Sequence, residues 1–309
     1  MQSVTIGTRG SPLAIAQAEE VRKKLAAAHG LERDTIAIKV IKTSGDIIQD
    51  RPLSEVGGKG LFTKEIEKAL FDGDIDLAVH SSKDMPTHLP NGMVLSAFLE
   101  REDPRDAFIS LIAKSPDHLP EGARIGTSSL RRGAQFKRFR PDFRIVDFRG
   151  NVATRLKKLA DGVADATLLA LAGLNRLGEA HRATLVLDTK DFPPAPAQGA
   201  ICVETRENDT RTTELVAALN HTETAVRIHA ERAFLDTLDG SCKTPIAALS
   251  AFEGGRLTLF GQILSPDGKE AFEDEISGNA DDAEALGHTL GEKLKSEAGT
   301  DFLETLKRA

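Results

Sequence analysis

The 309-residue sequence lacks tryptophan and tyrosine and has only two cysteines. Single-stranded nucleic-acid binders and sugar sites depend on stacking aromatic side chains, so the missing Trp and Tyr argue against both classes. Two cysteines cannot make the disulfide framework of a small secreted domain. Neither an apolar run long enough to span a membrane nor an early signal-like apolar segment is present. We therefore expect a cytosolic chain with no membrane partner.

An excess of positive charge is also absent. Forty basic residues stand against 47 acidic ones, which gives a net charge of −7. This balance argues against a nucleic-acid partner bound through bulk positive charge. With 40% hydrophobic and 28% charged residues, the chain has enough apolar material to fold, and its length allows more than one domain.

The first part of the chain alternates between strand-like and helix-like segments. Strands are predicted at 3–7, 36–40, 75–79 and 93–99, and helices at 12–29 and 61–70. Ser11 and Pro12 supply an N-cap and a first-turn proline for the first helix, which Gly30 ends. This order predicts a β-α-β-α-β unit.

The same alternation restarts after the charged stretch 100–106. Strands are predicted at 107–113, 143–148 and 165–170, and helices at 128–139 and 151–160. Prolines at 193, 194 and 196 make 192–199 a crossing segment. The strand at 201–204 and the helix near 211–219 are then expected to return to the first unit. Two crossings between two units indicate a hinged cleft.

The last part of the chain has a different pattern. A helix at 221–238 precedes strands at 246–252, 256–263 and 270–276 and a charged helix at 281–297. The predicted fold is α/β, with two doubly wound domains around a hinged cleft and a smaller α+β domain at the C-terminus. The predicted domains are 1–99 with 200–219, 100–199, and 220–309.

Four strand ends carry loops in which hydroxyl or amide groups accompany a cation. In open α/β sheets, ligands bind beyond the carboxyl ends of the strands, where helix N-termini favour anions. One such loop is an ordinary helix cap, but four together indicate a polyanionic ligand. The loops are Thr8-Arg9-Gly10-Ser11, Ser81-Ser82-Lys83-Asp84, Thr127-Ser128-Ser129-Leu130-Arg131-Arg132 and Arg149-Gly150-Asn151.

The basic residues concentrate in one window of this acidic chain. Residues 124–155 hold nine basic and two acidic residues, a net charge of +7. Such a cluster focuses the field in one place, although a local nucleic-acid patch stays open. Lys137, Arg138, Arg140 and Arg144 fit a solvated helix face. The better ligands are the residues on strand-end loops or in the following turn, namely Arg131, Arg132, Arg149 and Arg155.

A glycine-rich segment, Gly57-Gly58-Lys59-Gly60, follows the mostly polar stretch 42–52. It lacks the Gly-Lys-Ser/Thr ending of a phosphate-binding loop, so it does not indicate a nucleotide. A long polar connection of this kind is typical of a mobile lid, and a plain surface loop is equally consistent with it.

The two cysteines occupy opposite contexts. Cys202 lies in a strand of apolar residues, where a free cysteine is usually inert. Cys242 lies between Gly240 and Pro245, beside Lys243, which favours the thiolate. Cys242 is therefore the candidate reactive sulfur, and a Cys-His protease pairing stays open. The spacing of His, Cys and Asp suits no metal site.

Asp84 follows Lys83 and precedes Met85-Pro86, which ends its element. A carboxylate among cations stays ionised at neutral pH. It could serve as a counter-ion or helix cap, or it could face a positive charge that develops on a substrate.

Taken together, these loops resemble the porphobilinogen deaminase family, and the match runs almost from end to end. The ordered motifs are highly specific as a set. They are Thr8-Arg9, 11–14, 57–62, 80–84, 101–106, 126–132, 149–151, 198–200 and Gly240-Ser241-Cys242. Glu55 departs from the family pattern, where lysine is common, which argues against an anion contact from that position.

The resemblance implies three domains, two of them similar to periplasmic binding proteins, and a dipyrromethane cofactor joined to Cys242 by a thioether. It implies an enzyme that condenses four porphobilinogens head to tail, with loss of ammonia, and releases hydroxymethylbilane by hydrolysis. Asp84 would be the catalytic carboxylate. A monomer is the family expectation.

The resemblance also assigns binding residues, because each pyrrole ring carries an acetate and a propionate that arginine forks suit. The cofactor would be held by Lys83, Thr127, Ser129, Arg131 and Arg132. The substrate would be held by Arg9, Ser11, Ser81, Arg149, Arg155 and Gln198. Lys59 and Phe62 would belong to the lid.

A hinged binding protein for a carboxylated solute is the alternative, because the two α/β units alone support it equally. That alternative gives no role to Cys242 or to the third domain.

Overall fold

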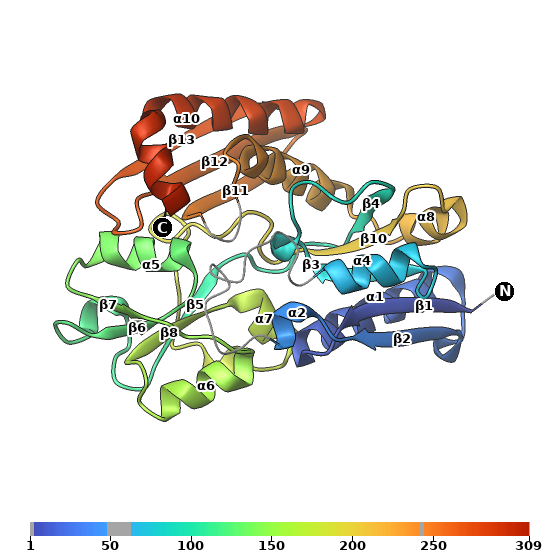
Figure 1. The fold of residues 1–309 in the computed structure, drawn as a ribbon, viewed down its shortest axis with the longest axis horizontal. Coiled ribbons are helices and arrows are strands. Elements are labelled where there is room, and N and C mark those ends of the chain that lie inside the picture. The colour runs from blue at the N-terminus through green and yellow to red at the C-terminus, as the bar shows by residue number, and fades with distance from the viewer. Residues whose placement is uncertain (1–2, 48–62, 241–243, 309) are drawn as a thin grey trace. The chain divides into compact units, whose positions relative to one another are not determined.

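The computed structural model describes residues 3–47, 63–240 and 244–308. The chain forms two compact units, one from Met1–Glu102 and Ala200–Ala225, the other from Asp103–Gly199 and Val226–Ala309. The described residues form three β-sheets (Figure 1).

The first unit is built on a five-stranded sheet with the order β2-β1-β3-β10-β4. Its strands are β1 (Val4–Arg9), β2 (Ile36–Ile41), β3 (Leu77–Ser81), β4 (Met93–Phe98) and β10 (Ile201–Arg206). β1 runs parallel to β2 and β3, whereas β10 lies antiparallel between β3 and β4. The predicted return of the chain to the first unit after residue 200 is therefore confirmed.

Helices cover both faces of this sheet. α1 (Pro12–His29) and α8 (Thr210–Ala217) bury Val21, Leu25 and Val216 on one face, in a core with alternate residues of the strands. α4 (Lys64–Phe71) buries Ile66 and Leu70 on the other face. α1 is capped as predicted, because Ser11 accepts the N–H of Ala14 and Gly30 adopts φ 60°. The described part of this unit also contains η1 (Arg33–Thr35), α2 (Ser44–Ile47) and η2 (Ser82–Asp84).

The α/β part of the second unit has a sheet of order β7-β6-β8-β5-β9. Its elements are β5 (Asp106–Ser110), η3 (Pro116–His118), β6 (Arg124–Gly126), α5 (Leu130–Phe139), β7 (Arg144–Val146), α6 (Val152–Ala160), β8 (Ala166–Ala170), α7 (Leu171–Arg176), η4 (Ala180–Arg182) and β9 (Leu185–Val186). β6 is parallel to β7 and β8, and β5 is antiparallel to β8 and β9. α5 lies on one face and α6 on the other (Figure 1).

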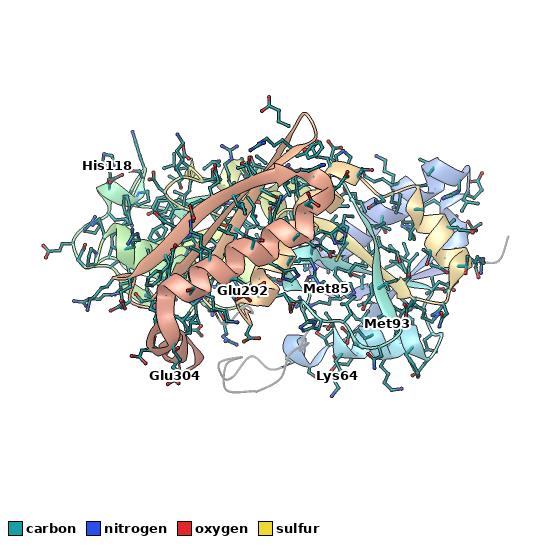
Figure 2. The ribbon with its side chains drawn as sticks, turned by 90° about the horizontal axis from the view of Figure 1, so that it is seen from above. Lys64, Met85, Met93, His118, Glu292 and Glu304 are labelled. Atoms are coloured by element: carbon teal, nitrogen blue, oxygen red, sulfur yellow. The ribbon has the colours of Figure 1, made fainter. Side chains whose placement is uncertain are left out.

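The C-terminal part has a three-stranded antiparallel sheet, β11-β12-β13. Its elements are α9 (Thr222–Thr237), β11 (Ile246–Glu253), β12 (Arg256–Leu264), β13 (Ala271–Asn279), η5 (Ala280–Asp282) and α10 (Ala283–Arg308). α10 bends at Gly299, which has φ 73° and ψ 163°, so its direction changes between the labelled residues Glu292 and Glu304 (Figure 2).

These elements confirm the predicted fold class, with two α/β sheets and a small α+β part at the C-terminus. The predicted helices and strands agree with the observed ones to within a few residues, except that α10 continues to Arg308 instead of ending at 297, and α2, β6, α7 and β9 were not predicted. Each is too short to show a hydrophobic period. The three domain ranges stay a prediction.

The turn that follows α9 ends the described segment at Gly240. Asp239 adopts φ 50°, and the N–H of Gly240 donates to the carbonyl of Leu235 at 2.9 Å. A Cβ on Gly240 would lie 2.4 Å from Leu235 Cδ1, 2.7 Å from Ile246 Cδ1 and 3.0 Å from Leu235 O. An alanine at this turn would therefore require Leu235 and Ile246 to shift and would crowd a backbone carbonyl.

We expect Gly240→Ala to lower the free energy of unfolding by about 1–3 kcal/mol, because the added methyl group overpacks the turn. Urea unfolding followed by circular dichroism measures the change. Gly133→Ala is the matched control: its Cβ would meet Ile145 at an ordinary 3.6 Å inside α5, so we expect no loss. Equal midpoints for Gly240→Ala and the unmodified chain would contradict the packing argument.

Candidate active site

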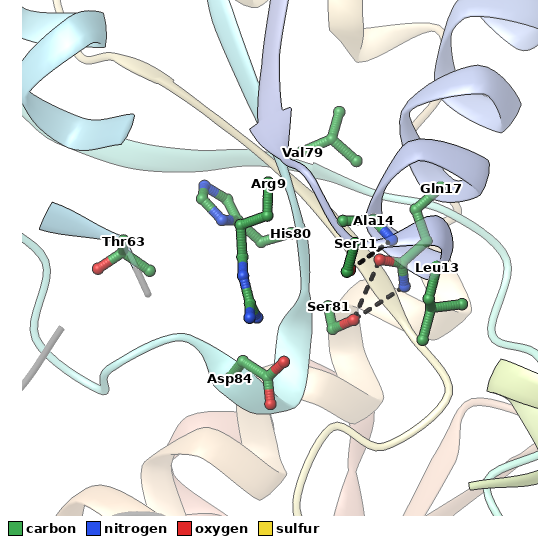
Figure 3. Close-up of a pocket in the computed structure, with 10 residues that line it drawn as sticks. All are labelled: Arg9, Ser11, Leu13, Ala14, Gln17, Thr63, Val79, His80, Ser81 and Asp84. Carbon is green, nitrogen blue, oxygen red and sulfur yellow. Dashed lines mark hydrogen bonds between the residues drawn. The ribbon is translucent and has the colours of Figure 1, made fainter. Parts of the chain in front are cut away.

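A polar pocket of the first unit opens where β1 and β3 end (Figure 3). Its lining combines a cation, a carboxylate, hydroxyls and an amide, groups that can bind a carboxylated ligand and accept a proton. The lining residues are Arg9, Ser11, Leu13, Ala14, Gln17, Thr63, Val79, His80, Ser81 and Asp84. Four predicted site residues, Arg9, Ser11, Ser81 and Asp84, thus meet in one pocket.

Helix capping places Ser11 at the edge of this pocket. Its hydroxyl accepts the N–H of Ala14 at 3.2 Å, and Pro12 opens the helix. The neighbouring Thr8 is buried and donates to the carbonyl of Ala14 at 3.2 Å. The β1–α1 turn is therefore held by its own side chains, and the N-terminus of an 18-residue helix faces the pocket.

The turn that carries Asp84 follows β3 directly. The N–H of Ser82 donates to the carbonyl of Ala200 at 3.0 Å, and Met85 is buried after the turn. Asp84 itself is half-buried. Figure 3 shows the guanidinium end of Arg9 pointing toward the Asp84 side chain. Lys83 lies on the same turn but does not line the pocket.

Gln17 is a pocket residue that sequence reasoning missed. It is buried on α1, and its Nε2 lies 2.9 Å from Ser81 Oγ. The signal was a polar residue on the helix face that also carries the buried Ala14, Ala18 and Val21. Because Gln17 contacts Ser81, the β1–α1 and β3 elements are joined at the pocket wall.

His80 lines the pocket and forms a buried pair with Glu204, and neither was singled out from the sequence. His80 Nε2 lies 3.0 Å from Glu204 Oε2, across the β3–β10 pairing. Burial raises the pKa of the nearby Glu67, and the charge of Glu204 adds to that effect. The buried His80 and Glu204 and the half-buried Glu67 thus form a group of titratable side chains next to the pocket.

The second unit contains the predicted arginine cluster at the start of α5. Arg131 and Arg132 are buried, and both pair with Asp106 at the start of β5. Arg131 Nη2 lies 2.9 Å from Asp106 Oδ2, and Arg132 Nη2 lies 2.7 Å from Asp106 Oδ1. Burial lowers the pKa of Arg131, and the charge of Arg132 adds to that lowering, whereas Asp106 opposes it. Asp106 was not predicted as a site residue.

The predicted hydroxyl ligands of this loop have structural partners. Ser129 caps α5 by accepting the N–H of Arg132 at 3.4 Å, and Thr127 accepts the N–H of Ser129 at 3.1 Å. Gln198 is buried, and its Nε2 donates to the carbonyl of Pro104 at 2.7 Å and to Asp106 Oδ1 at 2.8 Å. Gln198 therefore joins the arginine cluster.

Arg149 and Arg155 flank the N-terminus of α6, and both are half-buried. Arg149 Nε lies 3.5 Å from Asp147, and Arg155 Nε donates to the carbonyl of Gly150 at 2.9 Å. Asn151 caps the helix by accepting the N–H of Thr154 at 2.9 Å. This turn gathers two cations at a helix N-terminus, an arrangement that suits an anion.

Three predicted site residues, Cys242, Lys59 and Phe62, lie outside the described residues, as does Glu55. Cys202 is fully buried in β10, and its sulfur lies 3.8 Å from the carbonyl of His80. Within 3–47, 63–240 and 244–308, no group of three His, Cys, Asp or Glu side chains could hold a metal ion. Among those residues no helix is long and apolar enough to cross a membrane.

Comparison with solved structures finds partial likenesses at low identity. The methionine-binding protein MetQ has a TM-score of 0.45 at 15% identity, over 72% of this chain and 92% of that one. A periplasmic substrate-binding protein of an ABC transporter from Coxiella burnetii has a TM-score of 0.42 at 19% identity, over 72% of this chain and 94% of that one.

Comparison with known sequences gives a much stronger match. Residues 4–214 match the family model described as porphobilinogen deaminase, dipyromethane cofactor binding domain, and residues 225–296 match porphobilinogen deaminase, C-terminal domain. The porphobilinogen deaminase of Paracoccus denitrificans (strain Pd 1222) is 55% identical over 301 residues, which cover 97% of this chain and 96% of that relative. The chain therefore belongs to the porphobilinogen deaminase family.

Proposed function

We propose that this chain catalyses the porphobilinogen deaminase reaction of tetrapyrrole biosynthesis. It joins four porphobilinogen molecules head to tail, with loss of ammonia, on a covalently bound dipyrromethane and releases hydroxymethylbilane by hydrolysis. The observation that carries this proposal is the 55% identity to a curated porphobilinogen deaminase over nearly the full length of both chains. That match favours the transferase over a hinged binding protein.

The buried basic cluster fits a cofactor that carries carboxylates. Two guanidinium groups share the single Asp106 carboxylate, and Arg131 Nε is buried without a hydrogen-bond partner among the described residues. A buried excess of positive charge with a spare donor favours an anionic ligand. Arg131 and Arg132, with Lys83, Thr127 and Ser129, would hold the acetate and propionate groups of the dipyrromethane. When bound, that group supplies the pyrrole carbon to which the first substrate is joined.

The residues that line the pocket and the α6 turn would hold the substrate. Arg9, Arg149 and Arg155 offer cations for the acetate and propionate of porphobilinogen, and Ser11 and Ser81 offer hydroxyls. Gln198 is assigned to the same set by resemblance. Lys59 and Phe62 are assigned to a lid.

Asp84 would be the catalytic carboxylate. Its place in the pocket beside Arg9 allows the side chain to face a substrate whose own carboxylates occupy the cations. The Asp84 carboxylate would stabilise the positive charge that the pyrrole gains as ammonia leaves. Its oxygen would then accept the proton that the ring carbon loses when the new carbon–carbon bond forms.

We also propose a thioether at Cys242, a cytoplasmic location and a monomeric state, with porphobilinogen as the small-molecule partner and neither nucleic acid nor membrane. The thioether assignment is supported by the burial of Cys202, which argues against that sulfur as the point of attachment. The net charge of −7 supports the absence of a nucleic-acid partner.

Cys242→Ser should abolish attachment of the dipyrromethane and, with it, activity. Cys202→Ala should retain both, because a fully buried thiol in β10 takes no part in the chemistry. Intact mass after mild purification, followed by peptide mapping, locates the added pyrrole units. An unmodified 241–249 peptide in active, freshly purified protein contradicts the assignment.

Asp84→Asn should slow turnover by about 10²-fold or more, because the amide keeps the shape of the side chain but can neither offset the positive charge nor accept the proton. Steady-state rates and the melting temperature are measured together. The exposed Asp34→Asn serves as the control and should leave both unchanged. Near-normal turnover of Asp84→Asn with a lowered melting temperature would show that the carboxylate is structural.

A further inference from the structure

The Asp106 carboxylate is the centre of the arginine cluster. It is 1% exposed and accepts hydrogen bonds from the side chains of Arg131, Arg132 and Gln198. Oδ1 accepts from Arg132 Nη2 at 2.7 Å and from Gln198 Nε2 at 2.8 Å. Oδ2 accepts from Arg131 Nη2 at 2.9 Å and from Arg132 Nε at 3.2 Å. One buried carboxylate therefore orients both guanidinium groups at once.

The backbone and Gln135 fix the other sides of the two guanidinium groups. Arg131 Nη1 donates to Gln135 Oε1 at 3.0 Å and to the carbonyl of Pro193 at 2.9 Å. Arg132 Nη1 donates to the carbonyl of Leu168 at 3.1 Å. With these contacts made on folding, binding a ligand carboxylate does not require the long arginine side chains to lose further rotamer freedom.

The charge of the cluster is not balanced by these contacts. Two guanidinium groups face one carboxylate, which leaves a net charge of +1 in a place that water hardly reaches. The buried Arg131 Nε has no partner among the described residues. The cluster can therefore bind one further carboxylate.

The hydrogen bonds of Gln198 support the arginine cluster and do not leave its amide nitrogen available to substrate. Its single Nε2 carries two hydrogens, and its two hydrogen bonds go to Pro104 O and Asp106 Oδ1. The amide nitrogen has no hydrogen left for a ligand. Its contacts tie the crossing segment before Gly199 to the carboxylate that orients the arginines.

We propose that Asp106 and Gln198 are positioning residues, which hold Arg131 and Arg132 in place to receive one carboxylate of the dipyrromethane. The inference rests on the proposed function and deepens it. It moves Gln198 from the substrate-binding set to the support of the cofactor site. Neither residue needs to contact the cofactor. Replacing either one should still slow loading, which is the attachment of the dipyrromethane to the apo protein.

The test compares Asp106→Asn with the unmodified full-length protein. Asparagine keeps the size of the side chain, but it places an N–H group among donors and raises the net charge of the cluster to +2. We expect apo protein, expressed without porphobilinogen, to gain the mass of two pyrrole units about tenfold to a hundredfold more slowly on incubation with porphobilinogen. Circular dichroism establishes that the variant is folded.

Two further variants make the outcome decisive. Asp165→Asn is the matched control, because Asp165 pairs with the more exposed Arg124 of the same sheet, and loading should be normal. Gln198→Met keeps the shape but cannot donate. It should slow loading, while the KM for porphobilinogen of the loaded molecules stays unchanged.

The outcomes separate the two proposals. Normal loading of a folded Asp106→Asn variant overturns the positioning role. If Asp106→Asn does not fold, Gln198→Met decides: normal loading with a raised KM shows that Gln198 contacts substrate and overturns the inference. If the unmodified protein never gains the pyrrole mass, the proposed function itself fails.

Discussion

Two guanidinium groups can lie side by side in a protein interior only when an anion lies between them, because each buried charge otherwise retains a large desolvation penalty. Asp106 meets this condition for Arg131 and Arg132, at the start of the strand that is antiparallel to β8. The crossing segment 192–199 contacts the same cluster, through the carbonyl of Pro193 and the amide of Gln198. A single carboxylate balances only one of the two cations, and this excess of positive charge is the basis for the proposed binding of a further anion.

Strand-end geometry explains why the candidate ligands occur in loops. β1 and β3 are parallel neighbours, as are β6, β7 and β8, so their carboxyl ends meet at one edge of each sheet. Ser11, Ser129 and Asn151 cap the helices that follow. These side chains accept hydrogen bonds from helix N–H groups. They also lie at helix N-termini, where anions bind favourably.

The pocket of the first unit depends on a strand that arrives late in the chain. β10 inserts between β3 and β4, and this brings Glu204 beside His80 and Ala200 beside Ser82. The turn with Asp84 is consequently held from both sides, by β3 and by the segment before β10. A support of this kind keeps the Asp84 carboxylate in one position.

The sequence alone determined the local structure and the chemical class of the ligand. Helix caps such as Ser11 and Gly30, the apolar strands, the basic loops and the family motifs all depend on residues close together in the chain. The three-residue β6 and the two-residue β9 were not predicted, because such short segments show no hydrophobic periodicity. Only the tertiary structure decided the partners of Asp106, His80 and Gln17. His80 and Glu204 are 124 positions apart, Asp106 and Gln198 are 92 apart, and Gln17 and Ser81 are 64 apart. No periodicity encodes such distances, because strand order and helix packing set which distant side chains share a buried space and must satisfy one another's charges and hydrogen bonds.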